Sequence, residues 1–334
     1  MTEKYFVAAG YGDTGQSSNL IVLKIADNGK IQIKQEFYYD GGPSYLVEKV
    51  ISDHRSCIYA AFEKTNEIVK FVWKNGTLTE EKRFQAPGEG LCHLCLSEDR
   101  TMLYGSCYMS GDYFAVDTEL TQCIWIKKGQ KDSHAHCIYK GKENRIYLVD
   151  LGLSSVCRYQ QKKKSLGECD LNFPIHAGEG PRQILLWNLE KNAVVINESS
   201  GTLSFWQIKQ QGTEQQVQRI CTRNTTKYIG NNAPGDAVIW NEKILFVGNR
   251  GAETVSAFSL ERFGEKIGEW DCGGKFPRGL FVSDEGVALT CCQKSGKLVS
   301  CRWDEEKAQL NICDSLNLPG AANVIEITAE EECL

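Results

Sequence analysis

The sequence lacks any long apolar run and any block of basic residues. No stretch approaches the roughly 20 apolar residues of a membrane-spanning helix, so we expect no membrane association. Lys and Arg number 38 against 43 Asp and Glu, a net charge of −5, which gives no reason to expect nucleic-acid binding. The first residues, MTEKYFVAAG, mix acid and base before a short apolar run. We therefore expect no signal peptide and a soluble, cytoplasmic protein.

The chain also lacks grouped metal ligands and helical periodicity. Its 5 histidines are dispersed, and no set of histidines and carboxylates has the spacing of a metal site. We expect no metal and no other cofactor. No useful length of sequence repeats its apolar residues with the period of a helix, so strands should dominate.

Cysteine, in contrast, is abundant. The 15 cysteines are an odd number and are scattered through apolar segments, as at Cys57, Cys137, Cys157, Cys291 and Cys301. This pattern predicts reduced thiols that pack as small apolar residues. Cys92 and Cys95 have the spacing of a metal-binding pair, but residues three apart in a strand point to opposite faces, and no second pair completes a site.

A pattern of short strands recurs seven times along the chain. Each repeat has an apolar strand, a turn, a second strand that ends in polar or glycine residues, and further strands, with a period of roughly 43 to 53 residues. Segments rich in Lys, Glu and Gln, such as 77–84, should be the outer strands. A pair of β-sandwiches is the main alternative, but it would not give a regular sevenfold recurrence.

The repeat predicts an all-β fold, a seven-bladed β-propeller with four-stranded blades, as a single domain over residues 1–334. The first blade lacks its innermost strand at the N-terminus. Residues 322–329, ANVIEITA, have the character to supply it. The ring should therefore close where the C-terminal strand joins the N-terminal blade.

Residues 177–203 show the unit most clearly, as two apolar strands joined by a polar turn. Arg182 opens the first strand and Glu198 follows the second. Because the two strands must be antiparallel, these side chains should share one edge of the sheet. We expect Arg182 to leave the sheet at the channel mouth with few apolar atoms packed on it, so that its truncation costs little stability.

Other unusual residues fall at equivalent strand ends, which a propeller brings to one mouth of its channel. They are His134, His136, Asp150, Asn249, Arg250 and Arg278. Together they describe a site for a small anion with acid–base capacity. Structural roles are the alternative for each: a histidine at a strand start, Asp150 bracing a turn, Arg278 paired with a rim carboxylate, and Glu198 in a solvated turn.

The segments GEGPRQILLW (178–187) and VVINESSGTLSFW (194–206) resemble the lactonase family of seven-bladed propellers, which includes bacterial 6-phosphogluconolactonase and fungal carboxymuconate cyclase. The resemblance extends in order over most of the chain. It implies active-site residues His136, Arg182, Glu198 and Arg250, and no metal. One departure is Gln183, where the family usually has a histidine after Gly-Pro-Arg.

The resemblance implies hydrolysis of a sugar lactone, with 6-phosphogluconolactone, a metabolite of the pentose phosphate pathway, as the first candidate substrate. His136 or Glu198 would take a proton from water, and Arg182 would stabilise the oxyanion. Arg250 and Arg278 would hold a phosphate or carboxylate, with Asp150, Asn249 and His134 nearby. The alternatives are a lactone cyclase or isomerase, and a propeller that binds a ligand or protein without catalysis. The oligomeric state does not follow from the sequence.

Overall fold

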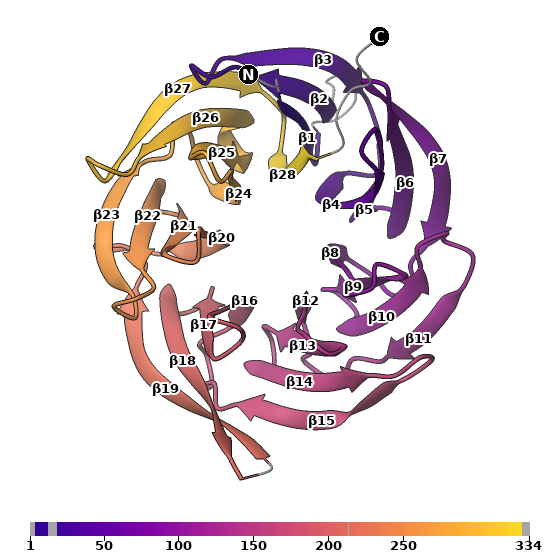
Figure 1. Ribbon diagram of the computed structural model, residues 1–334, viewed down its shortest axis with the longest axis vertical. Coiled ribbons are helices and arrows are strands. Elements are labelled where there is room, and N and C mark those ends of the chain that lie inside the picture. The colour runs from indigo at the N-terminus through magenta and orange to yellow at the C-terminus, as the bar shows by residue number, and fades with distance from the viewer. Residues whose placement is uncertain (1–3, 13–18, 213, 329–334) are drawn as a thin grey trace. The chain divides into compact units, whose positions relative to one another are not determined.

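The computed structural model consists of four-stranded sheets in which consecutive strands lie side by side (Figure 1). It describes residues 4–12, 19–212 and 214–328. Within these ranges there are seven such sheets and no α-helix, and one 3-10 turn, η1, covers Gln293–Ser295. None of the described residues forms a helix with the length and hydropathy needed to span a membrane. The prediction of seven four-stranded repeats is confirmed.

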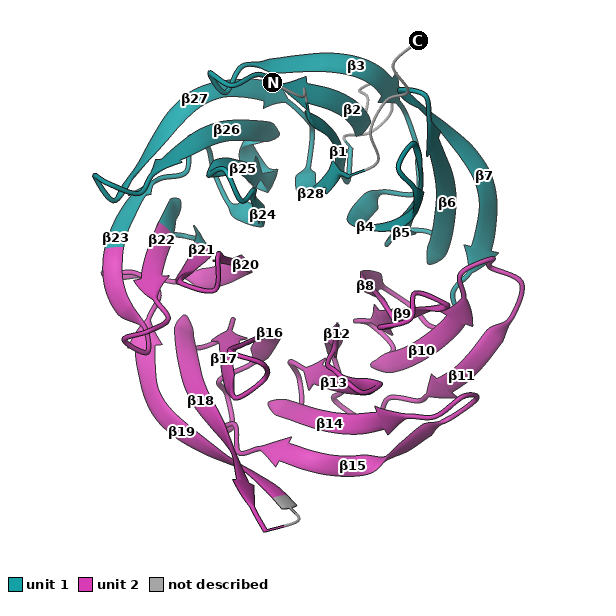
Figure 2. Ribbon diagram, viewed as in Figure 1, with its two compact units in different colours: residues 1–86, 248–255, 268–334 teal, residues 87–247, 256–267 magenta. Residues whose placement is uncertain are grey.

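The chain divides into two compact units (Figure 2). Unit 1 is residues 1–86, 248–255 and 268–334, and unit 2 is residues 87–247 and 256–267. The division passes through the sheet β20–β23. The expectation of a single domain over residues 1–334 remains a prediction.

Three sheets lie wholly in unit 1, and their strands are β28 (Ala321–Ile327), β1 (Lys4–Gly10), β2 (Leu20–Ile25), β3 (Ile31–Phe37); β4 (Pro43–Ser52), β5 (Arg55–Phe62), β6 (Glu67–Lys74), β7 (Thr77–Gln85); β24 (Pro277–Val282), β25 (Val287–Cys292), β26 (Lys297–Asp304), β27 (Gln309–Asn317). Three lie wholly in unit 2, with strands β8 (Leu91–Leu96), β9 (Met102–Cys107), β10 (Asp112–Asp117), β11 (Cys123–Lys127); β12 (Ala135–Lys140), β13 (Arg145–Asp150), β14 (Ser155–Gln161), β15 (Leu166–Phe173); β16 (Pro181–Trp187), β17 (Asn192–Asn197), β18 (Thr202–Gln211), β19 (Glu214–Asn224). The remaining sheet has β20 (Ala233–Trp240), β21 (Ile244–Arg250), β22 (Thr254–Ser259) and β23 (Glu265–Asp271).

The C-terminal strand completes the first sheet, as the sequence predicts. β28 pairs antiparallel with β1, with Val7 opposite Ile325 and Ala8 opposite Val324. The strand ends at Ile327, and residue 329 of the predicted segment lies outside the described residues. The first and last parts of the chain are therefore held in one sheet within unit 1.

Neighbouring sheets pack face to face through apolar cores, which explains why the middle strands are apolar on both sides. All six residues of β17 are buried. Ala193 and Val195 pack toward the β12–β15 sheet, whereas Val194 and Ile196 pack toward Leu245 of β21. Alternate residues of a strand face opposite sides, so a strand between two sheets needs a continuous apolar run. The outer strand β7 is instead mostly exposed, as predicted for the segment 77–84.

The cysteines mostly share in this packing. Cys57, Cys137, Cys291 and Cys301 are buried, and all the described cysteines are free thiols. Cys157 is half-buried, whereas Cys123 and Cys169 are exposed. The interpretation as small apolar residues therefore holds for most described thiols but is wrong for the exposed ones.

Candidate active site

In six of the sheets, a β-bulge at the start of the first strand in the sheet order redirects one side chain, and three of these side chains are candidates for the site. In β12, Ala135 lies opposite Asp150 and Cys137 lies opposite Val149, which leaves His136 as the extra residue. In β16, the same shift between Pro181 and Gln183 leaves Arg182 as the extra residue. In four other sheets the second residue of the equivalent strand is likewise the extra residue of a bulge. These residues are Ser44, Cys92, Arg278 and Ala322. A bulge takes one residue out of the ladder and redirects its side chain, a device common beside active sites.

Within unit 2, Arg182 gathers side chains from three consecutive sheets. Its Nη1 donates to Nε2 of His136 at 2.7 Å and to Oε2 of Glu198 at 2.9 Å. Its Nη2 donates to Oδ1 of Asp236, in β20, at 3.1 Å. The predicted sharing of one edge by Arg182 and Glu198 is confirmed, because Pro181 and Asn197, their neighbours in sequence, are directly paired. We call His136, Arg182, Glu198 and Asp236 the Arg182 cluster.

Arg182 is buried, which corrects the expectation of an exposed side chain at the channel mouth. Its side chain is 5% exposed, and it forms ion pairs with two carboxylates. Burial alone would lower the pKa of Arg182, but Glu198 and Asp236 outweigh it and raise that pKa. With a neutral His136, the cluster carries one more negative than positive charge. Its guanidinium is therefore balanced from within the protein and is no free anion-binding group.

The contact with Arg182 fixes the tautomer of His136 when that ring is neutral. A guanidinium has only donors, so Nε2 of His136 must accept, and the ring proton then sits on Nδ1. The ring of Tyr108 meets the ring of His136 edge to face, with centroids 5.9 Å apart. His136 is thus held between an aromatic ring and a charged donor.

His93 of β8 is a further histidine under the influence of this cluster. Burial, with a smaller contribution from the positive charge of Arg182, lowers the pKa of His93 to about 3. Its Nε2 lies 3.6 Å from Sγ of Cys137. His93 is therefore neutral at physiological pH and belongs to the apolar support behind the site.

Asp150 and His134 support a loop. The carboxylate of Asp150 accepts hydrogen bonds from the hydroxyl of Ser133, the backbone N–H of His134 at 2.9 Å and that of Leu153 at 3.0 Å. The ring of His134 stacks on Tyr108, with centroids 4.6 Å apart. These contacts favour the structural alternative for Asp150, and the substrate-binding role of both residues remains a prediction.

Asn249 repeats an arrangement seen at Asn197. Each asparagine is fully buried; Asn197 is the last residue of β17, and Asn249 is the last but one of β21. Asn197 donates to Oγ1 of Thr202, and Asn249 donates to Oγ1 of Thr254, both at 3.1 Å. The side chains fasten the turn that follows each strand, which orients the next residue, Glu198 or Arg250.

In unit 1, two arginines lie against aromatic rings. Arg278 stands over the ring of Tyr11 at 4.9 Å, and its Nη2 lies 3.4 Å from Oε2 of Glu63. The Tyr11 hydroxyl also donates to that carboxylate, and burial is the main cause that raises the pKa of Tyr11. This pairing matches the rim-carboxylate alternative for Arg278.

Arg250 is buried and stands over Phe276 at 5.1 Å, and Nζ of Lys294 lies 4.2 Å from the same ring. Cations over a ring face are attracted by its quadrupole, so Phe276 organises two positive charges. The structure describes these contacts within unit 1. The prediction that Arg250 and Arg278 bind substrate in one site with His136 remains a prediction.

Asp236 was missed by reasoning from the sequence. It directly precedes the apolar run 237–240 of β20, as Arg182 precedes an apolar run in β16. That position was the available signal, but an acid between glycine and an apolar run is equally typical of a solvated turn. Only the packing of β20 beside β16 makes it a partner of Arg182.

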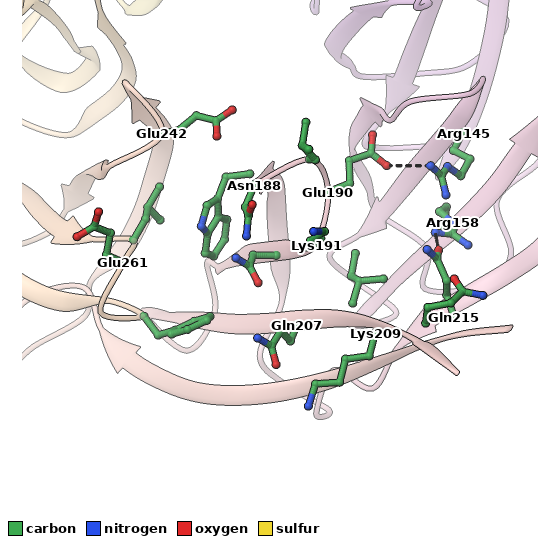
Figure 3. A pocket seen from close by; sticks show the side chains of 17 residues that line it. Arg145, Arg158, Asn188, Glu190, Lys191, Gln207, Lys209, Gln215, Glu242 and Glu261 are labelled. Carbon is green, nitrogen blue, oxygen red and sulfur yellow. Dashed lines mark hydrogen bonds and ion pairs between the residues drawn. The ribbon is translucent and has the colours of Figure 1, made fainter. Parts of the chain in front are cut away.

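A groove of about 890 Å³ in unit 2 is separate from the Arg182 cluster and shares no lining residue with it (Figure 3). Three of its charged residues are in ion pairs: Arg145 pairs with Glu190 at 3.5 Å, and Arg158 pairs with Asp170 at 2.8 Å. Size alone therefore does not identify this groove as the reactive site.

Across the described ranges of the chain, no group of three or more His, Cys, Asp or Glu side chains is arranged to hold a metal ion. Cys92 and Cys95 do not converge: Sγ of Cys92 contacts the carbonyl oxygens of Ala135 and His136, and Sγ of Cys95 contacts that of Leu96. The absence of a role for a metal in the reaction remains a prediction.

Several known proteins resemble this chain. It is 22% identical to the uncharacterized protein YwcC of Lactococcus lactis over 292 residues, 81% of this chain and 83% of that protein. The structure of a periplasmic gluconolactonase from Pseudomonas aeruginosa superposes with a TM-score of 0.86 at 17% identity, covering 98% of this chain and all of that one. A protein from Bacteroides fragilis described as a "putative 6-phosphogluconolactonase" gives 0.84 at 18% identity, covering 98% of both chains.

A family model covers nearly the whole described chain. The model described as "Lactonase, 7-bladed beta-propeller" matches residues 6–325. This match confirms the fold predicted from the sevenfold repeat. The chain belongs to the lactonase family of seven-bladed β-propellers.

Proposed function

We propose that this protein hydrolyses a sugar lactone, with 6-phosphogluconolactone as the first candidate, in the cytoplasm and in carbohydrate metabolism. Family membership supports a lactone as the substrate class. The observation that carries the proposal is the Arg182 cluster, in which a histidine and two carboxylates meet one buried guanidinium. Two proteins of similar structure, one described as a gluconolactonase and the other as a "putative 6-phosphogluconolactonase", support the same chemistry.

The reaction needs a base, a place for the oxyanion and a proton for the leaving oxygen. A water oxygen attacks the lactone carbonyl carbon while the base takes a proton from that water. The bond between the carbonyl carbon and the ring oxygen then breaks, and that oxygen receives a proton to give the open hydroxy acid. General acid–base catalysis of this kind typically contributes about 10²–10⁴-fold in rate.

Glu198 is the better base of the two residues that the sequence left open. The neutral imidazole of His136 has one acceptor nitrogen, Nε2, and Arg182 already donates to it. A carboxylate has about four acceptor positions. Glu198 can therefore keep its bond to Arg182 through Oε2 and still accept from water.

Arg182 retains little donor capacity for an oxyanion. Both hydrogens of Nη1 are engaged by His136 and Glu198, and one hydrogen of Nη2 is engaged by Asp236. Two of the five N–H donors remain: the buried Nε–H, which has no hydrogen-bond partner among the described residues, and the second hydrogen of Nη2. We assign the Nη2 hydrogen to the developing charge on the carbonyl oxygen. Preorganised donors of this type stabilise the transition state most effectively because they need not reorient.

The proposal is tested by stopped assays on freshly made 6-phosphogluconolactone, gluconolactone and a carboxymuconate-type lactone, each corrected for spontaneous opening. Faster opening of a sugar lactone than in buffer is the expected result. Interconversion of the carboxymuconate-type lactone with its open carboxymuconate form, which has three carboxyl groups, would instead identify a cyclase or isomerase. No acceleration with any of the three would contradict the proposal and favour a binding propeller.

A further inference from the structure

We propose that Asp236 is a positioning residue for the reaction, which holds Arg182 in the orientation that serves His136 and Glu198, and that Gln183 keeps Asp236 in place. The kinetic part of this inference rests on the proposed lactonase function. Its structural part concerns the state of His136 and is measurable without any substrate.

Asp236 supplies the second fixed point of a planar group. Glu198 binds Nη1 of Arg182 at 2.9 Å, and Asp236 binds Nη2 at 3.1 Å. The guanidinium is rigid and flat, so contacts at two nitrogens determine the direction of all its N–H bonds. With only Glu198 in place, the group could rotate about its bonds and still keep one ion pair.

The direction set in this way matters at His136. The remaining hydrogen of Nη1 meets Nε2 of that ring at 2.7 Å. This bond determines which ring nitrogen carries the proton. A rotation of the guanidinium would break it and free the ring to change tautomer.

Gln183 fixes the backbone beside Asp236. Its Oε1 accepts from the backbone N–H of Ala237 at 2.9 Å, and its Nε2 donates to the carbonyl of Ala237 at 3.2 Å. Two consecutive residues of β16 therefore bind two consecutive residues of β20. Arg182 binds the side chain of Asp236, and the side chain of Gln183 clamps the backbone of Ala237 with two hydrogen bonds. Since the clamp uses a side-chain amide, it is independent of charge.

The burial of Arg182 and Asp236 supports a positioning role for their ion pair. Asp236 has 18% of its side chain exposed and Arg182 has 5%, so their attraction is only partly screened by water. A carboxylate of a similar ion pair, Asp170 with Arg158 at 2.8 Å, has 43% of its side chain exposed and lies outside the cluster. Asp170 therefore provides a matched control.

The first experiment compares Asp236→Asn, Gln183→Ala and Asp170→Asn in steady-state lactone hydrolysis. We expect kcat of Asp236→Asn to fall about 10- to 100-fold, as misplacement of a catalytic group by about 1 Å does elsewhere, with KM nearly unchanged. Gln183→Ala should change kcat in the same direction by less. Asp236→Glu should recover part of the rate, and Asp170→Asn should match the parent protein.

The second experiment follows the ring nitrogens of His136 by NMR of protein labelled with ¹⁵N-histidine, with the signal assigned from His136→Gln. In the parent protein, the neutral ring should show the Nδ1–H tautomer. In Asp236→Asn, and to a smaller extent in Gln183→Ala, a population with the proton on Nε2 should emerge. Asp170→Asn should leave the spectrum unchanged.

An Asp236→Asn variant with parental kcat, or with an unchanged His136 signal, would overturn the proposal. If this variant does not fold, Gln183→Ala and Asp236→Glu decide by the same two readouts. If the parent protein opens no lactone, the proposed function fails, but the tautomer measurement still decides whether Asp236 positions Arg182.

Discussion

Replacement of Arg182 by methionine should destabilise the protein by about 3 kcal/mol, near the lower end of the range for removing one partner of a buried ion pair. Methionine keeps an unbranched side chain as far as the position of Nε but removes the guanidinium group and its charge. Glu198 and Asp236 would then face each other across the cluster without a cation. Their side chains are 25% and 18% exposed, so water screens part of the repulsion and places the expected cost near that lower end.

The free energy of unfolding is measured by urea titration followed by tryptophan fluorescence, because Trp206 is fully buried between sheets of unit 2. Arg262→Met is the control, since Arg262 and its partner Glu265 are 66% and 56% exposed and such pairs contribute about 0–1 kcal/mol. A triple variant, Arg182→Met with Glu198→Gln and Asp236→Asn, should recover most of the loss, because no uncompensated charge remains.

The comparison of single and triple variants isolates charge from packing. A free energy of unfolding of Arg182→Met within about 0.5 kcal/mol of the parent value, as for substitutions at exposed positions, would show that the buried guanidinium does not stabilise the fold. That result would refute the expected cost. If the triple variant is as unstable as the single one, packing rather than charge balance holds the cluster together.

Four further outcomes are expected. The pKa of His93 is lowered to about 3, so below roughly pH 6.5 the unfolded chain binds a proton that the folded protein does not. The free energy of unfolding should therefore fall by up to about 1.4 kcal/mol per pH unit as the pH is lowered toward about 3. An equally steep fall for His93→Gln in denaturant titrations would contradict this. Brief alkylation of the native protein followed by mass spectrometry should label Cys123 and Cys169 before the other described thiols, and labelling of buried thiols first would contradict the packing. Lactonase activity should survive a chelator, and a loss restored by a divalent ion would show that a metal is required. Arg250→Gln and Arg278→Gln should raise KM for the phosphorylated lactone about 10-fold and leave KM for gluconolactone unchanged, and equal effects on both would argue against phosphate binding.

Local patterns predicted the strands and the pairing of Arg182 with Glu198. Both residues belong to one hairpin, whose antiparallel register follows from a short turn, so their proximity needed no knowledge of the rest of the fold. The closure by β28 was predictable for a similar reason, since the seventh repeat leaves one apolar strand unused.

The surroundings of Arg182 could not be predicted in the same way. Asp236 lies 54 residues further along the chain, and its contact depends on how two sheets pack. The bulge that releases His136 and Arg182 from their ladders involves no distinctive residue type, as Ser44, Cys92 and Ala322 occupy the same place elsewhere. Burial of Arg182 follows from both effects, and neither leaves a pattern in one strand.

The central claim, that Glu198 takes the proton in lactone opening, is tested most directly by kcat of Glu198→Gln on 6-phosphogluconolactone. The amide keeps the size of the side chain but cannot act as a base, so kcat should fall by about 10²-fold or more. Glu190→Gln removes a carboxylate paired with Arg145 outside the Arg182 cluster and should retain parental kcat. A Glu198→Gln variant that keeps at least half the parental kcat would contradict the claim.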